Sequence, residues 1–173
     1  MDEPVIDLQN DRHFMGEALR QAARAYEAGE VPVGAVIVRE GRIIARAFNQ
    51  VELLKDATAH AEMLAITQAE EVAGDWRLTD CTLYVTKEPC PMCAGAMVHT
   101  RLARVVFGVS DPKAGAAGGA LNLLQFPTFN HHCQITGGVR ETECCALLKN
   151  LFAEQRAAEN REKKNSGNIP ENV

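Results

Sequence analysis

Two short motifs, HAE at residues 60–62 and PCPMC at residues 89–93, constrain this chain more than any other part of its sequence. Cys90 and Cys93 are three positions apart, and at the first turn of a helix two thiolates with this spacing project to one side and can hold one ion. His60 offers a third ligand. A zinc ion bound by two cysteines and one histidine keeps a coordination position open for water. The motifs therefore predict a hydrolytic metal site.

Each motif taken alone has other interpretations. A CxxC pair is also found in structural zinc sites and in redox-active thiol pairs, and a single helical histidine is often an ordinary surface or core residue. A structural zinc site needs four protein ligands, and the chain has no second CxxC and no HxxxH spacing to complete one. A redox pair does not require the HAE motif. The combination of the two motifs therefore favours a catalytic zinc site over both alternatives.

Glu62 follows His60 by two residues, so at the start of a helix its carboxylate can lean across the open coordination position. Zinc bound by two thiolates and a neutral imidazole carries no net charge, and its bound water needs a nearby base. If the HAE and PCPMC motifs each open a helix, two positive helix ends converge on the metal and favour the thiolates of Cys90 and Cys93. We therefore expect Glu62 to transfer protons and not to bind the metal.

The composition indicates a single domain in a reducing compartment. The chain has 173 residues, of which 46% are hydrophobic, which suits one domain over residues 1–164 with a flexible tail over residues 165–173. The start of the chain is acidic and polar and no run of eighteen apolar residues exists, so we expect a cytoplasmic protein without membrane contact. The net charge of −5 argues against unspecific adhesion to nucleic acid, although it allows a local basic site. The four cysteines outside the motif are predicted to be small core residues: Cys81, Cys133, Cys144 and Cys145.

Hydrophobic periodicity predicts strands that alternate with helices, and therefore an α/β domain with helices on both faces of a mixed sheet. The expected helices cover residues 11–29, 59–72, 91–100 and 141–163, and the expected strands cover residues 33–38, 43–48, 82–86, 104–109 and 133–136. Pro91 suits the first position of the helix that carries the cysteines. The connection over residues 49–57 is polar, and the segment over residues 110–132, which contains AGAAGG, is long enough to predict a functional loop.

Several stretches of the sequence resemble the bacterial tRNA-specific adenosine deaminases over nearly the whole chain. These stretches are EVPVGAVIV at residues 30–38, FNQ at 48–50, TAHAEM at 58–63, TLYVTKEPCPMCAGAMVHTRLARVVFG at 82–108 and DPKAGAAG at 111–118. HAE followed by PCPMC is also the general signature of zinc nucleobase deaminases. The resemblance implies the cytidine-deaminase-like fold, which is a three-layer α/β/α sandwich around a central mixed five-stranded sheet.

The same resemblance implies a homodimer with one Zn²⁺ per subunit that converts adenosine to inosine at the wobble position of a tRNA anticodon, typically that of arginine tRNA with anticodon ACG. Zinc would activate a water for attack on C6 of a flipped-out adenine, and Glu62 would protonate the ring. By motif position, Asn49 contacts the nucleoside, Val33 walls the base, and Asp111 with Lys113 lies near the preceding nucleotide. Each has a plainer alternative, because Val33 can be strand core, Asp111 can cap its turn and Asn49 can close a loop.

Two other classes of function remain open at this stage. A deaminase of a free nucleobase or nucleoside, such as guanine or cytosine, would share the four motif residues but needs no polynucleotide surface. A zinc-stabilised binding module would keep the metal and lack turnover. The apolar side chains over residues 92–98 suggest a dimer face. The basic residues predicted to carry RNA affinity are Arg101, Arg104, Lys113, Lys149, Arg156 and the EKK run at residues 162–164.

Overall fold

The computed structural model describes residues 8–166, and its centre is a mixed five-stranded sheet in the order β2-β1-β3-β4-β5. The antiparallel hairpin of β1 and β2 joins β3 in antiparallel pairing, and β4 and β5 continue the sheet in parallel. The sheet is therefore mixed and five-stranded, as expected from the sequence. The strands are β1 (Gly34–Arg39), β2 (Arg42–Phe48), β3 (Cys81–Lys87), β4 (Arg104–Val109) and β5 (Gln134–Thr136).

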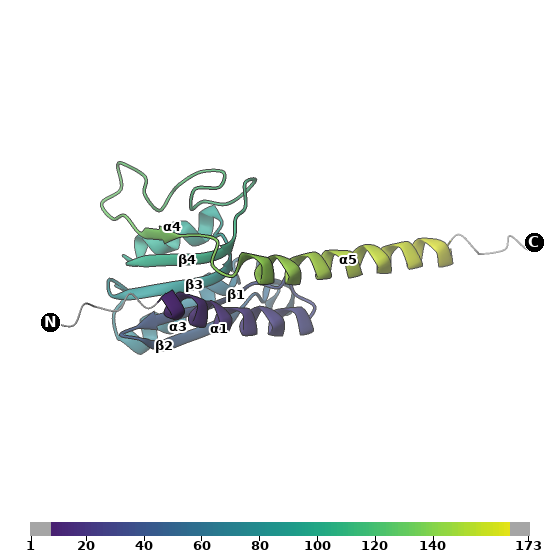
Figure 1. Cartoon of the computed structure of the whole chain (residues 1–173), viewed down its shortest axis with the longest axis horizontal. Coiled ribbons are helices and arrows are strands. Elements are labelled where there is room, and N and C mark those ends of the chain that lie inside the picture. Colours follow the sequence, from purple (N-terminus) through teal and green to yellow (C-terminus); the bar gives the residue numbers. More distant parts are fainter. Residues whose placement is uncertain (1–7, 167–173) are drawn as a thin grey trace, which may run out of the picture.

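Helices cover both faces of this sheet, so the predicted three-layer α/β/α sandwich is confirmed (Figure 1). One face is covered by α1 (Leu8–Glu27) and the first turns of α5 (Glu141–Ser166). The other is covered by α3 (Ala61–Ala73) and α4 (Pro91–His99). No helix within residues 8–166 combines the length and the apolar character needed to cross a membrane.

Alternation along each strand divides the apolar side chains between two cores. In β1, Ala35 and Ile37 face α3 and α4, whereas Val36 and Val38 face α1. The strands β3 and β4 alternate in the same way, and three of the four cysteines expected in the core, Cys81, Cys133 and Cys144, are buried. Because both faces are covered, β1 and β4 read as continuous apolar runs in the sequence.

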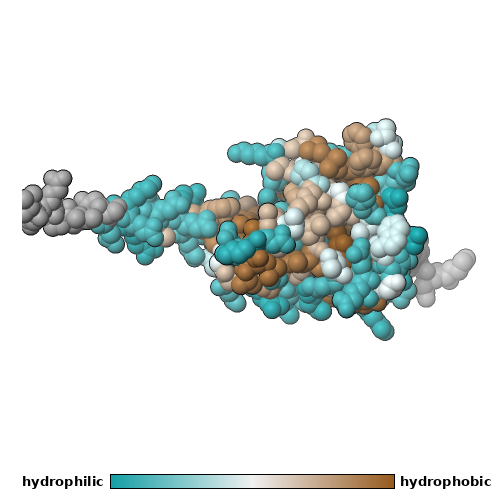
Figure 2. Space-filling model, turned by 180° about the vertical axis from the view of Figure 1, so that it is seen from behind, coloured by the Kyte–Doolittle hydropathy of each residue, from teal (hydrophilic) through white to brown (hydrophobic). Residues whose placement is uncertain are grey.

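Two local expectations differ from the structure. The polar connection after β2 contains the one-turn helix α2 (Val51–Leu54), which hydrophobic periodicity cannot detect because it buries no side chain of its own. The predicted apolar stripe of α5 is buried only as far as Leu151, and Phe152 is 45% exposed. Beyond this point α5 extends away from the sheet, and its surface is hydrophilic in the space-filling view (Figures 1 and 2). The expected tail begins inside this helix, at Asn165, and residues 167–173 lie outside the described part.

The backbone of helix α1 lies directly against Gly34, the first residue of β1. A Cβ atom on Gly34 would lie 2.1 Å from the carbonyl oxygen of Ala18 and 2.3 Å from the amide nitrogen of Ala22. These atoms belong to the helix backbone, so no side-chain rotation can relieve the contact. The absence of a side chain at Gly34 therefore sets the distance between α1 and the sheet.

We predict that Gly34→Ala lowers the free energy of unfolding by about 3 kcal/mol, because α1 must move away from β1. Gly74→Ala is the matched control, since Gly74 has open space around it and only a positive φ of 66°. That substitution should cost about 1 kcal/mol through backbone strain alone. Urea denaturation of both variants measures the two values. Equal losses of unfolding free energy in the two variants would contradict the predicted contribution of packing at Gly34.

Candidate active site

The predicted site residues gather at one edge of the sheet because of how the strands pair. Gly34 of β1 lies opposite Phe48 of β2, Ala35 lies opposite Val85 of β3, and Lys87 lies opposite Val109 of β4. The start of β1 and the ends of β2, β3 and β4 therefore meet at this edge. The segments that begin there carry the residues singled out in the sequence, namely Val33, Asn49, Cys90 and Asp111.

His60 and Cys90 occupy equivalent places in two helices. His60 is the N-cap of α3 and Cys90 is the N-cap of α4, with Pro91 at the first helical position as expected. Neither N-cap side chain makes a capping hydrogen bond. Serine, threonine, aspartate or asparagine at an N-cap would stabilise a helix by about 1 kcal/mol. Both helices therefore start with a side chain that leaves the capping position unused and is free to bind a ligand.

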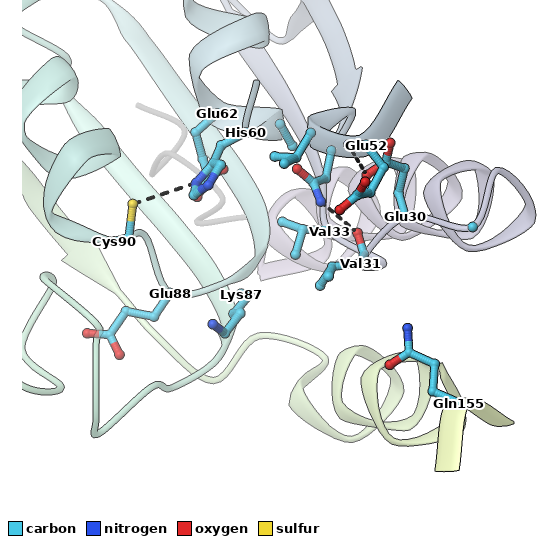
Figure 3. A pocket seen from close by; sticks show the side chains of 14 residues that line it. Glu30, Val31, Val33, Glu52, His60, Glu62, Lys87, Glu88, Cys90 and Gln155 are labelled. Carbon is cyan, nitrogen blue, oxygen red and sulfur yellow. Dashed lines mark hydrogen bonds between the residues drawn. The ribbon is translucent and has the colours of Figure 1, made fainter. Parts of the chain in front are cut away.

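The imidazole and the two thiols lie within ligand distance of one another. His60 Nδ1 is 3.6 Å from Cys90 Sγ and 3.5 Å from Cys93 Sγ, and all three ligand atoms lie within 4.8 Å of one another. Figure 3 shows His60 pointing toward Cys90 across the gap between the two helix starts. Two soft sulfur donors and one imidazole suit Zn²⁺, which accepts both ligand types in tetrahedral geometry. Within residues 8–166 no fourth donor joins this group, which leaves one tetrahedral position open.

The thiols already differ in their affinity for protons. A hydrogen bond from the Cys93 thiol lowers the pKa of Cys90 to about 3, and His60 adds to this effect. The same hydrogen bond, together with burial, raises the pKa of Cys93. The hydrogen bond with Cys90 also raises the pKa of His60. The arrangement therefore favours negative charge on Cys90, which a metal cation would use directly.

Glu62 lies in the first turn of α3 and is only 4% exposed. Burial raises the pKa of its carboxyl group to about 7. Its side chain lies beside His60 in the close-up view, and it is not part of the group of clustered ligand atoms (Figure 3). A carboxyl group with a pKa near neutrality can both accept a proton and return it. This geometry is the one expected for a proton-transfer group.

A pocket of about 310 Å³ opens in front of these residues, a size at the lower end of the range for small-molecule sites. Five of the residues predicted from the sequence line it: Val33, Asn49, His60, Glu62 and Cys90. Cys93 is buried directly behind Cys90. The carboxylate of Glu30 and the amide of Gln155, which come from elements that the motifs do not include, also line the pocket.

Asn49, which lines this pocket, has an unused hydrogen-bond acceptor. Its Nδ2 donates to the carbonyl oxygen of Val31 at 3.3 Å, which fixes the orientation of the amide. Its Oδ1 is buried and has no hydrogen-bond partner within residues 8–166. A buried acceptor without a partner costs about 1–3 kcal/mol, and a ligand that donates a hydrogen bond would recover this. The amide is therefore able to bind a ligand in addition to closing the loop after β2.

Asp111 and Lys113 lie outside the pocket lining. Asp111 Oδ1 accepts the backbone N–H groups of Lys113 and Ala114 at 3.0 and 3.1 Å, and Asp111 Oδ2 is 2.8 Å from Lys87 Nζ. Asp111 therefore caps its own turn, as its plainer interpretation predicts, and also pairs with a lysine that lines the pocket. The side chain of Lys113 is exposed beside it.

The basic residues predicted to bind RNA do not share one surface. Arg104 begins β4 at the far end from the pocket, and its guanidinium donates to both carboxylate oxygens of Asp11 at 2.9 and 2.7 Å. Tyr84 donates to the same carboxylate. Arg104 therefore ties α1 to the sheet and is poorly placed for RNA at the pocket. Arg156, in contrast, is exposed next to the pocket residue Gln155 on α5.

Comparison with known proteins agrees with this site. A family model described as MafB19-like deaminase matches residues 9–156. The tRNA-specific adenosine deaminase of Bacillus subtilis (strain 168) is 49% identical over 158 residues, which cover 91% of this chain and 98% of the relative. The chain belongs to the tRNA-specific adenosine deaminase family.

Two solved structures of deaminases are similar to this chain in sequence and fold. One, from a study of A-to-I editing by tRNA:A34 deaminases at the wobble position of transfer RNA, is 44% identical with a TM-score of 0.76, and the match covers 79% of this chain and 99% of that one. A guanine deaminase from Bacillus subtilis is 42% identical with a TM-score of 0.56, over 62% of this chain and 69% of that one. The deaminase fold thus accompanies both RNA and free-base substrates among similar proteins.

Sequence reasoning missed three residues that shape the site: Glu30, Lys87 and Glu88. Glu30 is 1% exposed, and its carboxylate accepts the backbone N–H groups of Glu52 and Leu53 at 3.1 and 2.6 Å. It thereby holds the start of α2 against the pocket. The signal was weak, because a single acidic residue after a helix usually lies in solvent. Glu30 lies in the quoted stretch at residues 30–38, and Lys87 and Glu88 lie in the one at residues 82–108, but none of the three has a role assigned from the sequence.

We predict that Glu30→Gln lowers the free energy of unfolding by about 1–3 kcal/mol, because an amide offers one acceptor where the carboxylate offers two. Hydrogen exchange at the Leu53 amide should accelerate more than exchange in the sheet. Glu27→Gln, three residues earlier on α1 and exposed, is the control and should change stability by less than about 0.5 kcal/mol. A Glu30→Gln variant that matched this control in both measurements would refute the capping role.

Proposed function

We propose that this protein hydrolytically deaminates adenosine to inosine at the wobble position of a tRNA anticodon, with zinc as its cofactor. The observation that carries the proposal is the convergence of His60, Cys90 and Cys93 with the buried Glu62 on one pocket, in a member of the tRNA-specific adenosine deaminase family. Arginine tRNA with anticodon ACG is the substrate that we propose, in the cytoplasm, with residues 1–164 acting as one catalytic domain.

His60, Cys90 and Cys93 would hold the zinc ion, which when bound supplies a water of lowered pKa at the open position. Glu62 would accept a proton from water and deliver it to the ring of the base, because burial raises the pKa of its carboxyl group toward neutrality. Glu62 and Cys93 are buried, so these groups have little contact with bulk water. The outcome is loss of the exocyclic amine as ammonia.

Val33 and Asn49 would hold the base. Val33 is half-buried and lies on the pocket wall just before β1, so its side chain offers an apolar surface to the purine. The free Oδ1 of Asn49 accepts a hydrogen bond from the nucleoside. Asp111 and Lys113 would contact the preceding nucleotide, from the loop that adjoins the pocket through Lys87. Recognition of a flipped-out base by such a pocket is common to enzymes that modify bases.

A deaminase of free guanine is the second candidate, because the guanine deaminase of Bacillus subtilis is 42% identical to this chain over the matched region.

The zinc-loaded protein should convert adenosine to inosine in an anticodon stem-loop with the sequence ACG at its anticodon. Reverse transcription reads inosine as guanosine at the first anticodon position. Turnover of free guanine, cytidine or adenosine without any turnover of the stem-loop would exclude the proposed activity on tRNA.

We predict that Glu62→Ala retains one zinc ion per chain and loses at least about a hundredfold in turnover. The physical reason is that the carboxyl group transfers protons and does not bind the metal. Metal content by atomic emission and inosine formation in the stem-loop measure the two properties separately. Glu71→Ala, on the exposed end of the same helix, serves as the control. Loss of zinc in Glu62→Ala would assign Glu62 to the metal site instead.

We also propose a homodimer, but on a different surface from the helix over residues 92–98. Cys93, Ala94, Met97 and Val98 of α4 are buried within the chain's own core, so this helix has few apolar side chains to offer. The neighbouring segment exposes Leu121, Phe126 and Phe129, and the rings of the two phenylalanines lie 5.0 Å apart. An exposed apolar group of this kind is typical of an interface.

Sedimentation at micromolar concentration should give a species with twice the mass of one chain. We predict that Phe126→Glu shifts it to the monomer, because a charge would have to be buried in the interface. Phe152→Glu places the same change on an exposed phenylalanine of α5 and is the control. A monomeric wild-type protein would remove the dimer from the proposal.

A further inference from the structure

The segment Ser110–Gly119, here called the anchor loop, is organised around a buried carboxylate. Glu88 is only 3% exposed. Its Oε2 accepts the backbone N–H of Asp111 at 2.6 Å, and its Oε1 accepts those of Ala117 and Gly119 at 3.1 and 2.7 Å. The hydroxyl of Ser110 is 3.5 Å from Oε2. A loop without helix or strand thus satisfies three backbone donors through one side chain.

The small residues of the anchor loop are a consequence of this carboxylate. A Cβ atom on Gly115 would lie 2.2 Å from Glu88 Oε2, and one on Gly119 would lie 2.4 Å from the same oxygen. Both would also meet the carbonyl oxygen of Asp111, at 2.5 and 2.3 Å. Neither glycine has a positive φ. Space, and not backbone freedom, therefore requires glycine at these two positions, because the loop closes around the carboxylate.

The same carboxylate belongs to the turn that presents Cys90. Glu88 donates its backbone N–H to the carbonyl oxygen of Val109 at 2.8 Å, and Ala116 donates to the carbonyl oxygen of Pro89 at 2.8 Å. On the other side of the loop, Lys87 Nζ pairs with Asp111 Oδ2. Figure 3 shows the Glu88 carboxylate directed away from His60 and Cys90. Glu88 therefore connects the ligand-bearing turn to the anchor loop without facing the reacting groups.

We propose that Glu88 is a positioning residue for the polynucleotide: it holds the anchor loop, with Asp111 and Lys113, in a fixed place relative to Cys90. The inference rests on the proposed function. A pocket of about 310 Å³ is suited to one nucleoside, so the flanking nucleotides must lie on the rim. Pro112 and Lys113 are exposed in the anchor loop, which adjoins the pocket through the ion pair of Lys87 and Asp111. A rim held rigidly before binding loses less conformational entropy when the RNA binds.

This assignment differs from a merely structural role in what it predicts for kinetics. A carboxylate that only stabilised the fold or the metal turn would, when replaced, lower the amount of zinc-loaded enzyme and reduce kcat. Replacing a carboxylate that positions the rim should instead weaken binding of the stem-loop. The step at the base should continue at nearly its normal rate, because His60, Glu62, Cys90 and Cys93 keep their places.

The test compares Glu88→Gln, Gly119→Ala and the double variant with the wild-type protein, all loaded with zinc. Glu88→Gln keeps the size of the side chain but turns an amide N–H₂ toward backbone donors. Gly119→Ala disrupts the same contact from the loop side, because the added Cβ would clash with the Glu88 carboxylate. Glu71→Gln, an exposed carboxylate on α3, is the control. The readouts are zinc per chain, hydrogen exchange at the amides of Ala117 and Gly119 or its replacement, and kcat and KM for the anticodon stem-loop.

Both single variants should keep one zinc ion, exchange faster in the anchor loop and raise KM by about tenfold, with kcat changed by less than about threefold. The double variant should raise KM no further than the stronger single variant, because both changes break one contact. Unchanged KM overturns the proposal, as does a fall in zinc content together with kcat. If the wild-type protein fails to convert the stem-loop, both the proposed function and the positioning role are overturned. If the wild-type protein converts it and the variants behave like the wild type, only the positioning role is overturned.

Discussion

The structure depends above all on two helices that start at the same edge of one sheet. The antiparallel pairing of β1 with β2 and β3, and the parallel pairing of β3 with β4, bring four strand ends together there. His60 and Cys90 are the N-caps of the helices that begin beside these ends. Each helix gives up a stabilising cap, and the two side chains meet at a distance at which they could bind one metal ion. Departure from a local rule is common at functional sites, and here it occurs twice in one place.

Buried carboxylates form the second level of organisation. Glu30 binds backbone donors of α2 on one side of the pocket, and Glu88 binds those of the anchor loop on the other. Glu62 lies between them with its pKa raised to about 7. The first two hold neighbouring backbone segments through their hydrogen bonds, whereas the raised pKa of the buried Glu62 suits it to proton transfer.

The residues that were missed share a physical reason. Nothing in the periodicity of the sequence distinguishes Glu30 or Glu88 from a solvent-exposed acid, because their partners are backbone amides 22 to 31 residues away. The helix α2 was missed for the related reason that its stability comes from Glu30 and not from its own side chains. Conversely, the stripe of α5 is regular far beyond the point where the sheet can cover it, so Phe152 is exposed although its spacing predicts burial.

The sequence by itself determined the strands, the principal helices and the candidate metal-binding group of His60, Cys90 and Cys93, because hydrophobic alternation and the CxxC spacing are local properties that need no knowledge of the fold. It also determined that Glu62 stands two residues after His60, and therefore on the same helix start. Only the tertiary structure decided which acceptors are left unused, as at Asn49, and which charges are already paired, as at Arg104. Those properties depend on contacts between distant segments, and such contacts exist only once the sheet edge has assembled.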